Sequence, residues 1–147
     1  MQRIIVTGAT SMIGVALIEE CIKHGTEVYA VVREGSKKRS RLPESSLIKF
    51  ADCSLEHLDR LPEMISQECD TFYHIAWGNT GENRNSSTEL QSRNIGYTLA
   101  AVKAAAALGC KRFIGAGSQA EYGLLDLDRI SPESAANPTT PYGAAKL

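Results

Sequence analysis

Short apolar runs alternate along the chain with longer stretches in which apolar residues recur at helical spacing. A run that is apolar at consecutive positions is typical of a strand buried on both faces, as in a parallel sheet. Two such runs predict buried strands at residues 4–6 and 28–32, and three further short segments predict strands at residues 47–50, 71–76 and 113–117. The periodic stretches predict helices at residues 13–22, 55–65 and 88–108. Strands that alternate with helices form βαβ units, so we expect a parallel sheet with helices on both faces and strand order 3-2-1-4-5.

Glycine, proline and polar residues mark where these elements end. Gly25 and Gly109 stand where a glycine just beyond a helix belongs. Ser54 is a candidate N-cap for the second helix, which Pro62 would weaken or kink. Polar segments without periodicity predict mostly irregular structure at residues 33–46, 78–87 and 123–141.

Composition is that of a single soluble domain. The chain has 147 residues, a formal net charge of −1 and 43% hydrophobic residues. This length fits one domain, and the near-neutral charge gives no general attraction to nucleic acid or to an anionic membrane. No apolar run reaches the roughly 18 residues of a membrane span. The four scattered cysteines form no zinc motif and no disulfide framework, so we expect a cytoplasmic protein without a bound metal.

A turn containing two glycines joins the first predicted strand to the first predicted helix. Gly8 would permit a tight turn, Gly14 would let the helix pack close to the strand, and the helix N-terminus would offer free N–H groups to a pyrophosphate. Ser11 stands where a middle glycine would let the backbone approach the phosphates, and its hydroxyl is expected to bond a phosphate oxygen instead. The alternative is an ordinary strand-to-helix turn. We predict a dinucleotide site at Gly8, Thr10, Ser11, Met12, Ile13 and Gly14.

Arg33 follows the second predicted strand, at the position that discriminates between the two nicotinamide dinucleotides. An acid here usually binds the ribose 2′-hydroxyl of NAD, whereas an arginine suits the 2′-phosphate of NADP. Residues 33–41 hold five basic side chains and one acid, a composition that a solvated loop would also have. From the identity of Arg33 we predict that NADP is preferred over NAD.

Asp52 follows the third predicted strand. Its carboxylate would either accept a hydrogen bond from the adenine amino group or cap the helix that begins near Ser54, and both alternatives stay open. We count Asp52 and the neighbouring Cys53 among the candidate cofactor contacts.

Tyr142 and Lys146 stand four residues apart, which places them on one face of a helix. A phenol is a poor acid or base at neutral pH, but a nearby ammonium stabilises the phenolate, and the pair could then move a proton on a hydroxyl or carbonyl group. Ser118 follows the fifth predicted strand, where its hydroxyl would bond a substrate oxygen or only cap a turn. Asn94, within the long helix, would bond backbone or water, or lie on the solvated surface.

Taken together, these segments resemble the extended short-chain dehydrogenase/reductase family, the NAD(P)-dependent epimerase/dehydratase group that acts on nucleotide sugars. The resemblance spans the whole chain in family order and implies a doubly wound Rossmann fold. The residues that carry it are Thr-Gly-Ala-Thr-Ser-Met-Ile-Gly at 7–14, His-Ile-Ala-Trp at 74–77, Asn-Ile-Gly-Tyr-Thr at 94–98, Gly-Ser-Gln-Ala-Glu-Tyr-Gly at 117–123 and Pro-Tyr-Gly-Ala-Ala-Lys-Leu at 141–147.

The resemblance implies a role for each matching residue. Tyr142 would be the acid/base, Lys146 would assist it and hold the nicotinamide ribose, and Ser118 would bind the reacting oxygen. Asn94 looks like the family's helix asparagine and counts with them as a catalytic candidate. The segment after the fourth strand would line the cofactor, with Ile75, Ala76 and Trp77 as contacts.

Members of this family continue for about as many residues again, so we interpret residues 1–147 as the dinucleotide-binding domain without the last strands and the substrate domain. An alternative is a truncated, catalytically silent NAD(P)-binding module. The shortness of the last predicted helix suggests that residues 142–147 are mobile or held only by a neighbouring chain. It also suggests that the helix near 88–108 keeps exposed apolar surface that favours a homodimer, and that this chain alone shows no measurable turnover.

Overall fold

The computed structural model describes residues 2–125 and 129–147. It divides into two compact units, one made of Met1–Trp77 with Tyr97–Ala116 and the other of Gly78–Gly96 with Gly117–Leu147. No helix among the described residues is long and apolar enough to cross a membrane.

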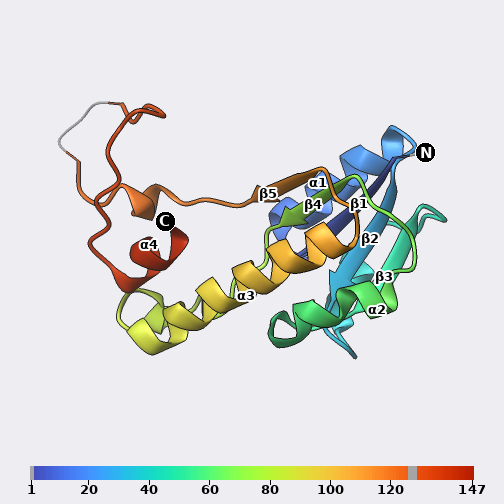
Figure 1. Cartoon of the computed structure of the whole chain (residues 1–147), viewed down its shortest axis with the longest axis horizontal. Helices are drawn as coiled ribbons and strands as arrows, with labels where there is room; N and C mark the ends of the chain where they lie inside the picture. The colour runs from blue at the N-terminus through green and yellow to red at the C-terminus, as the bar shows by residue number, and fades with distance from the viewer. Residues whose placement is uncertain (1, 126–128) are drawn as a thin grey trace. The chain divides into compact units, whose positions relative to one another are not determined.

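The first unit contains a five-stranded sheet in which every neighbouring pair is parallel (Figure 1). The order β3-β2-β1-β4-β5 confirms the prediction. β4 ends at His74 rather than at residue 76, because its neighbour β1 turns away at Gly8, where φ is +69°. The strands are β1 (Arg3–Thr7), β2 (Glu27–Val32), β3 (Ile48–Asp52), β4 (Thr71–His74) and β5 (Arg112–Gly115).

Successive residues of each inner strand face opposite sides of the sheet, and each side has its own apolar core. Ile5 belongs to one core and its neighbours Ile4 and Val6 to the other, which is why the run is apolar at every position. Helix α1 (Met12–Lys23) covers the Ile4 side through Ile18. The Ile5 side packs against α2 (Leu61–Met64), the 3₁₀ segment η2 (Leu55–Arg60) and the end of α3 (Thr88–Ala107).

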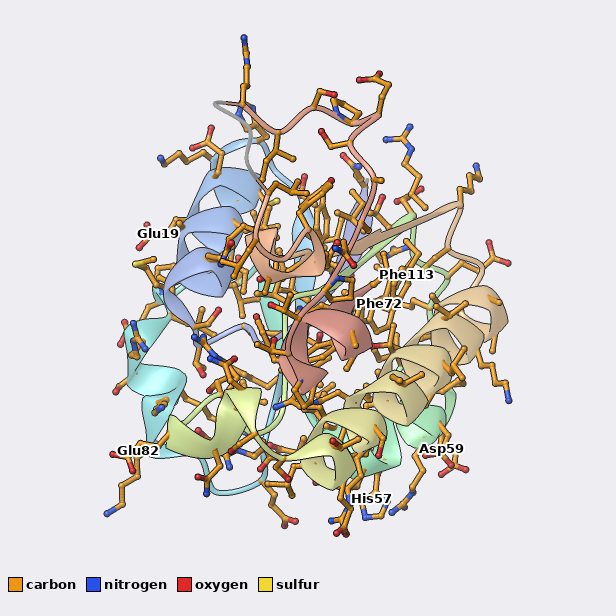
Figure 2. The ribbon with its side chains drawn as sticks, turned by 90° about the vertical axis from the view of Figure 1, so that its left-hand side faces the viewer. Glu19, His57, Asp59, Phe72, Glu82 and Phe113 are labelled. Atoms are coloured by element: carbon orange, nitrogen blue, oxygen red, sulfur yellow. The ribbon has the colours of Figure 1, made fainter. Side chains whose placement is uncertain are left out.

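An aromatic pair fills the Ile5 side beneath β4 and β5. The rings of Phe72 and Phe113 stack at 5.5 Å between centroids with an interplanar angle of 21°, and Figure 2 shows the two side chains on their neighbouring strands. Phe72 is fully buried. The same view shows Glu19, His57 and Asp59 at the surface of their helices, as their polarity requires.

The helix boundaries confirm the glycine signals but correct the second helix. Gly25 and Gly109 both adopt positive φ, at +72° and +74°, and each stands two positions after the last residue of its helix. The helix expected at 55–65 is instead a 3₁₀ segment interrupted by non-helical His57 and then a four-residue α2 that contains Pro62 near its start. Proline lacks the N–H that a residue inside a helix donates, so it is favoured in the first turn of a helix. It therefore starts a new helix here and does not continue the preceding 3₁₀ segment. Ser54 stands at the N-cap but makes no side-chain capping bond.

A network of charges crosses the amino ends of the first three strands. The carboxylate of Glu27, buried at its strand position, receives Arg3 Nε at 2.9 Å and Lys49 Nζ at 2.9 Å. The hydrogen bond from Lys49, followed by that from Arg3, holds the pKa of Glu27 below its ordinary value against the opposite effect of burial. These pairs tie β1, β2 and β3 together at the edge of the sheet opposite the predicted cofactor site.

The second unit consists of two 3₁₀ segments, η3 (Glu82–Asn85) and η4 (Gln119–Glu121), the first turns of α3, and the six-residue α4 (Pro141–Lys146). The described part of 123–141 is irregular up to α4, as expected. The expectation that residues 142–147 are mobile or held only by another chain is not what the structure shows. Thr140 caps α4 by accepting the N–H of Gly143 at 3.1 Å, and Gly143 is buried against Ala120 of η4 within the same chain.

Candidate functional site

The turn between β1 and α1 has the geometry of an anion-binding loop. Ser11 is the N-cap of α1, and its Oγ accepts the N–H of Gly14 at 3.0 Å, so the hydroxyl predicted to bond phosphate also caps the helix. Its own O–H remains able to donate. Within the described residues the backbone N–H groups of Met12 and Ile13 have no hydrogen-bond partner, and both side chains are exposed. Unpaired N–H groups at the start of a twelve-residue helix fit a pyrophosphate.

Both glycines of the turn are required by close packing. A Cβ on Gly14 would lie against the backbone oxygens of Gly8 and Ala9, and a Cβ on Gly8 would come within 2.7 Å of Ala76 N. The turn therefore lies directly beside the segment that follows β4. Thr10, between the two glycines, is partly exposed and lies in the same turn.

The segment after β4 is held to the end of β1 by a shared threonine. Thr7 Oγ1 lies 2.9 Å from His74 Nδ1 and accepts the N–H of Ala76 at 3.4 Å, while Ile75 N donates to the Thr7 carbonyl at 3.3 Å. Ala76 and Trp77 are partly exposed at the carboxyl ends of β1 and β4. In an open α/β sheet this is where the strand order reverses and where ligands bind, so the predicted cofactor contacts Ile75, Ala76 and Trp77 share one edge with the glycine turn.

The residues expected near the adenosine half of a cofactor lie at the ends of β2 and β3. Arg33 is exposed after β2. The carboxylate of Asp52 is ion-paired with Arg39, whose guanidinium also lies over the ring of Phe50 at 4.9 Å. Asp52 therefore does not cap the following 3₁₀ segment, and of the two alternatives for it the capping one is wrong. The loop at 33–46 is also more ordered than predicted, because residues Lys37–Arg41 form a 3₁₀ turn, η1.

Cys53 is a core residue at this edge rather than an exposed one. Its side chain is buried, and its thiol donates to the carbonyl of His57 at 3.1 Å. Burial raises the pKa of the Cys53 thiol. Any contact of Cys53 with a cofactor would therefore be made by its backbone.

In the second unit, Ser118 begins a reciprocal cap. Its Oγ accepts the N–H of Ala120 at 3.2 Å, while the carboxylate of Glu121 accepts the N–H of Ser118 at 2.6 Å. The capping alternative for Ser118 is thus correct, but it uses an oxygen lone pair and leaves the hydroxyl proton to donate to a ligand. The cap fixes the direction of the Ser118 side chain.

Ser118 and Tyr142 line the same cavity. The cavity has a volume of about 190 Å³ and is lined mainly by polar side chains from η3, η4 and the start of α4. Gly143 makes this arrangement possible, because a Cβ there would meet the Ala120 carbonyl oxygen. The close approach of α4 to η4 therefore brings the tyrosine that follows Pro141 beside the serine that precedes Gln119.

Two cationic side chains of the same unit belong to this site: Arg84 lies over the Tyr142 ring, and Lys146 is on the same helix as Tyr142. The guanidinium carbon of Arg84 lies 4.9 Å from the centre of the Tyr142 ring, a cation–π distance. Lys146, one turn further along α4, is half-buried; burial lowers the pKa of its ammonium, and the charge of Glu121 acts in the opposite sense.

Asn94 is buried, which corrects the alternative that it lies on the solvated surface. Its Oδ1 accepts the N–H of Gly78 at 2.7 Å and its Nδ2 donates to the Gly78 carbonyl at 3.0 Å and to Gln91 Oε1 at 3.1 Å. The amide thus pairs both backbone groups of one residue in the segment that leads from β4 towards η3. Asn94 is a positioning residue in this structure.

Two features of the site were missed by the sequence analysis. The pattern Ser118-Gln-Ala-Glu121 is a capping box and could have been recognised from its spacing. Arg84 gave no such signal, because it lies in a polar segment and meets Tyr142 only through the fold.

Comparison with known proteins identifies the kind of protein to which these features belong. The model of the NAD-dependent epimerase/dehydratase family matches residues 4–147. The dTDP-6-deoxy-L-talose 4-dehydrogenase (NAD(+)) of Aggregatibacter actinomycetemcomitans is 28% identical over 145 residues, which cover 99% of this chain and 52% of that protein.

Solved structures agree in fold. A crystal structure of UDP-galactose 4-epimerase matches with a TM-score of 0.84 at 23% identity, covering 99% of this chain and 48% of the other. The Bordetella bronchiseptica enzyme WbmG in complex with NAD matches with a TM-score of 0.81 at 23% identity, covering 98% and 46%. The chain thus spans about half the length of these relatives.

Proposed function

We propose, from the premise that the chain belongs to the NAD-dependent epimerase/dehydratase family, that it is the dinucleotide-binding domain of an epimerase, dehydratase or reductase that acts on a nucleotide sugar. The observation that carries the proposal is the cavity shared by Ser118 and Tyr142, the two hydroxyl-bearing residues predicted to act on the reacting oxygen. The names of the relatives, which include dTDP- and UDP-sugar enzymes, support the substrate class.

The first unit supplies the cofactor-binding residues. The N–H groups of Met12 and Ile13 and the O–H of Ser11 would hold the pyrophosphate, and the backbone from Ile75 to Trp77 would line the cofactor beside it. A bound nicotinamide dinucleotide supplies a hydride acceptor or donor. No side chain among the described residues of either unit can accept or donate a hydride in this way.

The second unit supplies the proton chemistry. Ser118 would donate a hydrogen bond to the sugar oxygen, and the Tyr142 phenolate would take the proton of the sugar hydroxyl as its carbon loses hydride, which leaves a carbonyl group. In the reverse direction the Tyr142 hydroxyl returns that proton to the carbonyl oxygen. A charged Lys146 near the phenolate would favour its formation, although burial already disfavours the charge of this ammonium.

The choice between NAD and NADP is a separate part of the proposal. Arg33, exposed after β2, favours NADP. Relatives are named or crystallised with NAD, so the preference for NADP rests on Arg33 alone. If Arg33 bonds the 2′-phosphate, Arg33→Ala should cost about 1.5–3 kcal/mol of NADP binding and leave NAD binding unchanged.

Self-association through α3 is the remaining part of the proposal. Leu99 and Val102 are 57% and 43% exposed, and Lys103 follows them on the same helix. Exposed apolar residues three positions apart form one helical face that a second copy of this chain would cover.

The experiment that tests the proposed function is a pair of titrations followed by an assay. The 147-residue chain is first titrated with NAD(H) and NADP(H). This chain and any longer product of the same gene are then incubated with oxidised cofactor and nucleotide sugars, and the formation of reduced nicotinamide is measured. Tyr142→Phe removes only the hydroxyl, so it should abolish turnover and keep cofactor affinity; Tyr73→Phe, a change on β4, is the matched control. Cofactor binding by a longer product that turns over no nucleotide sugar would support the silent binding module instead.

A further inference from the structure

The cavity beside Tyr142 carries a positive charge. Among its described lining residues Arg84 is the only charged one, and the others include the neutral polar side chains of Asn85, Gln119 and Thr139. Resting on the proposed function, we propose that Arg84 binds a carboxylate of the substrate, so that the protein acts on a nucleotide sugar whose sugar is a uronic acid.

The charge of Arg84 is not neutralised within the described part of the chain. None of the described carboxylates lies within ion-pair distance of it, whereas Arg93 of the same unit pairs with Glu89 at 2.7 Å. Glu82, on the same 3₁₀ segment, is exposed and makes no pair with it; Figure 2 labels this side chain at the surface. An arginine side chain is positively charged at neutral pH. A neutral-walled cavity with one such cation favours an anionic ligand over a neutral one.

The side-chain N–H groups of Arg84 donate no hydrogen bond to another described residue. Its guanidinium carbon lies 4.9 Å from the centre of the Tyr142 ring, a cation–π contact that does not consume these donors. The N–H groups lie in the guanidinium plane and form the fork that binds a carboxylate with two parallel hydrogen bonds. A carboxylate held by that fork would stand beside the phenol that is proposed to move the proton.

Sugar chemistry decides between the two anionic groups of a nucleotide sugar. In a hexuronic acid the carboxylate is attached to the ring carbon next to position 4, so an oxygen reacting at position 4 and the carboxylate are near neighbours. The diphosphate is attached at position 1, across the ring from position 4. Because Arg84 lies at the tyrosine where the reacting oxygen would bind, the geometry favours the carboxylate over the diphosphate.

The test compares three ligands in three proteins. Dissociation constants for UDP-glucuronate, UDP-glucose and UDP are measured by calorimetry, with reduced cofactor present, for the wild type, Arg84→Gln and the control Arg93→Gln. The wild type should bind UDP-glucuronate about tenfold or more tightly than UDP-glucose, the factor expected for one charge-assisted pair. Arg84→Gln should bring that ratio close to one without weakening UDP-glucose, and Arg93→Gln should leave the ratio unchanged.

Four results would overturn the inference, and they differ in whether they also remove the proposed function. If the wild type binds UDP-glucuronate and UDP-glucose equally well, or if its preference for UDP-glucuronate is unchanged in Arg84→Gln, Arg84 does not bind a carboxylate. The proposed function is unaffected by either result. Equal weakening of all three ligands by Arg84→Gln assigns the arginine to the diphosphate. Failure of both the 147-residue chain and any longer product of the same gene to bind any of the three ligands, with cofactor binding intact, removes both the inference and the proposed substrate class.

Discussion

Replacing Asn94 should destabilise the segment that carries η3 much more than the loss of a surface amide would. Asn94 is 1% exposed and pairs both the N–H and the carbonyl of Gly78. In Asn94→Ala both backbone groups lose their partner, and each unsatisfied group costs about 1–3 kcal/mol. With some access of water to the space left by the amide, we expect a loss of about 2–4 kcal/mol.

The isosteric change Asn94→Asp separates hydrogen bonding from packing. The new side chain keeps the acceptor for the Gly78 N–H but places a carboxylate oxygen against the Gly78 carbonyl and Gln91 Oε1, which need a donor. Only the protonated carboxyl restores that donor, so the folded state would raise the pKa of the introduced acid. Its destabilisation should therefore be largest near neutral pH and fall as the pH drops through that raised pKa.

The assay is urea unfolding followed by circular dichroism, together with hydrogen exchange of the Gly78 amide. Asn83→Ala is the control, because Asn83 is exposed on η3 and only its backbone carbonyl is used as an acceptor. A loss below about 0.5 kcal/mol for Asn94→Ala, the range of ordinary surface changes, or a Gly78 amide that stays equally protected, would refute the reasoning.

Three further predictions concern single residues. Glu27→Gln should lower the free energy of unfolding by about 1–2 kcal/mol at neutral pH. Because the pKa of Glu27 is lowered in the folded state, its stabilisation is present above the pKa of the unfolded state and is lost as the pH falls through the folded-state pKa, so wild type and variant should become equally stable in acid. The control Glu20→Gln, at an exposed position, should change the stability measured by urea unfolding little at any pH. Gly143→Ala should force α4 away from Ala120 and increase hydrogen exchange at 142–147, unlike Ala144→Ser at an exposed position of α4; unchanged protection would contradict the packing role. Leu99→Lys should shift sedimentation from dimer to monomer while the exposed change Lys103→Gln does not, and a wild type that is monomeric at all concentrations ends the dimer proposal.

The inner part of the sheet could be predicted from the sequence because the buried strands β1 and β2 follow one local rule. Ile4, Ile5 and Val6 are apolar in succession since both faces of β1 are buried, and this rule needs no knowledge of the partner strands. The prediction of one continuous helix at 55–65 was wrong. The spacing of the apolar residues there suits a helix, but His57 and Pro62 interrupt the helical backbone locally.

The candidate site was predictable only where a motif is continuous in sequence. The turn from Gly8 to Gly14 could be recognised because strand, turn and helix follow one another directly. Asn94 gave an ambiguous signal, since burial of a helical asparagine depends on a backbone sixteen residues away. The meeting of Arg84 with Tyr142, and the pairing of Asp52 with Arg39, arise only when separate segments fold together.

The most direct measurement of the central claim follows the backbone amides of the chain by NMR during titration with NAD(P)⁺. If the start of α1 holds the pyrophosphate, the resonances of Met12 and Ile13, whose N–H groups have no partner within the described residues, should shift strongly and saturate together. The amides of Glu27 and Arg3 at the opposite edge of the sheet should stay nearly constant. Saturable binding that leaves Met12 and Ile13 unmoved, or the absence of any binding, would contradict the account.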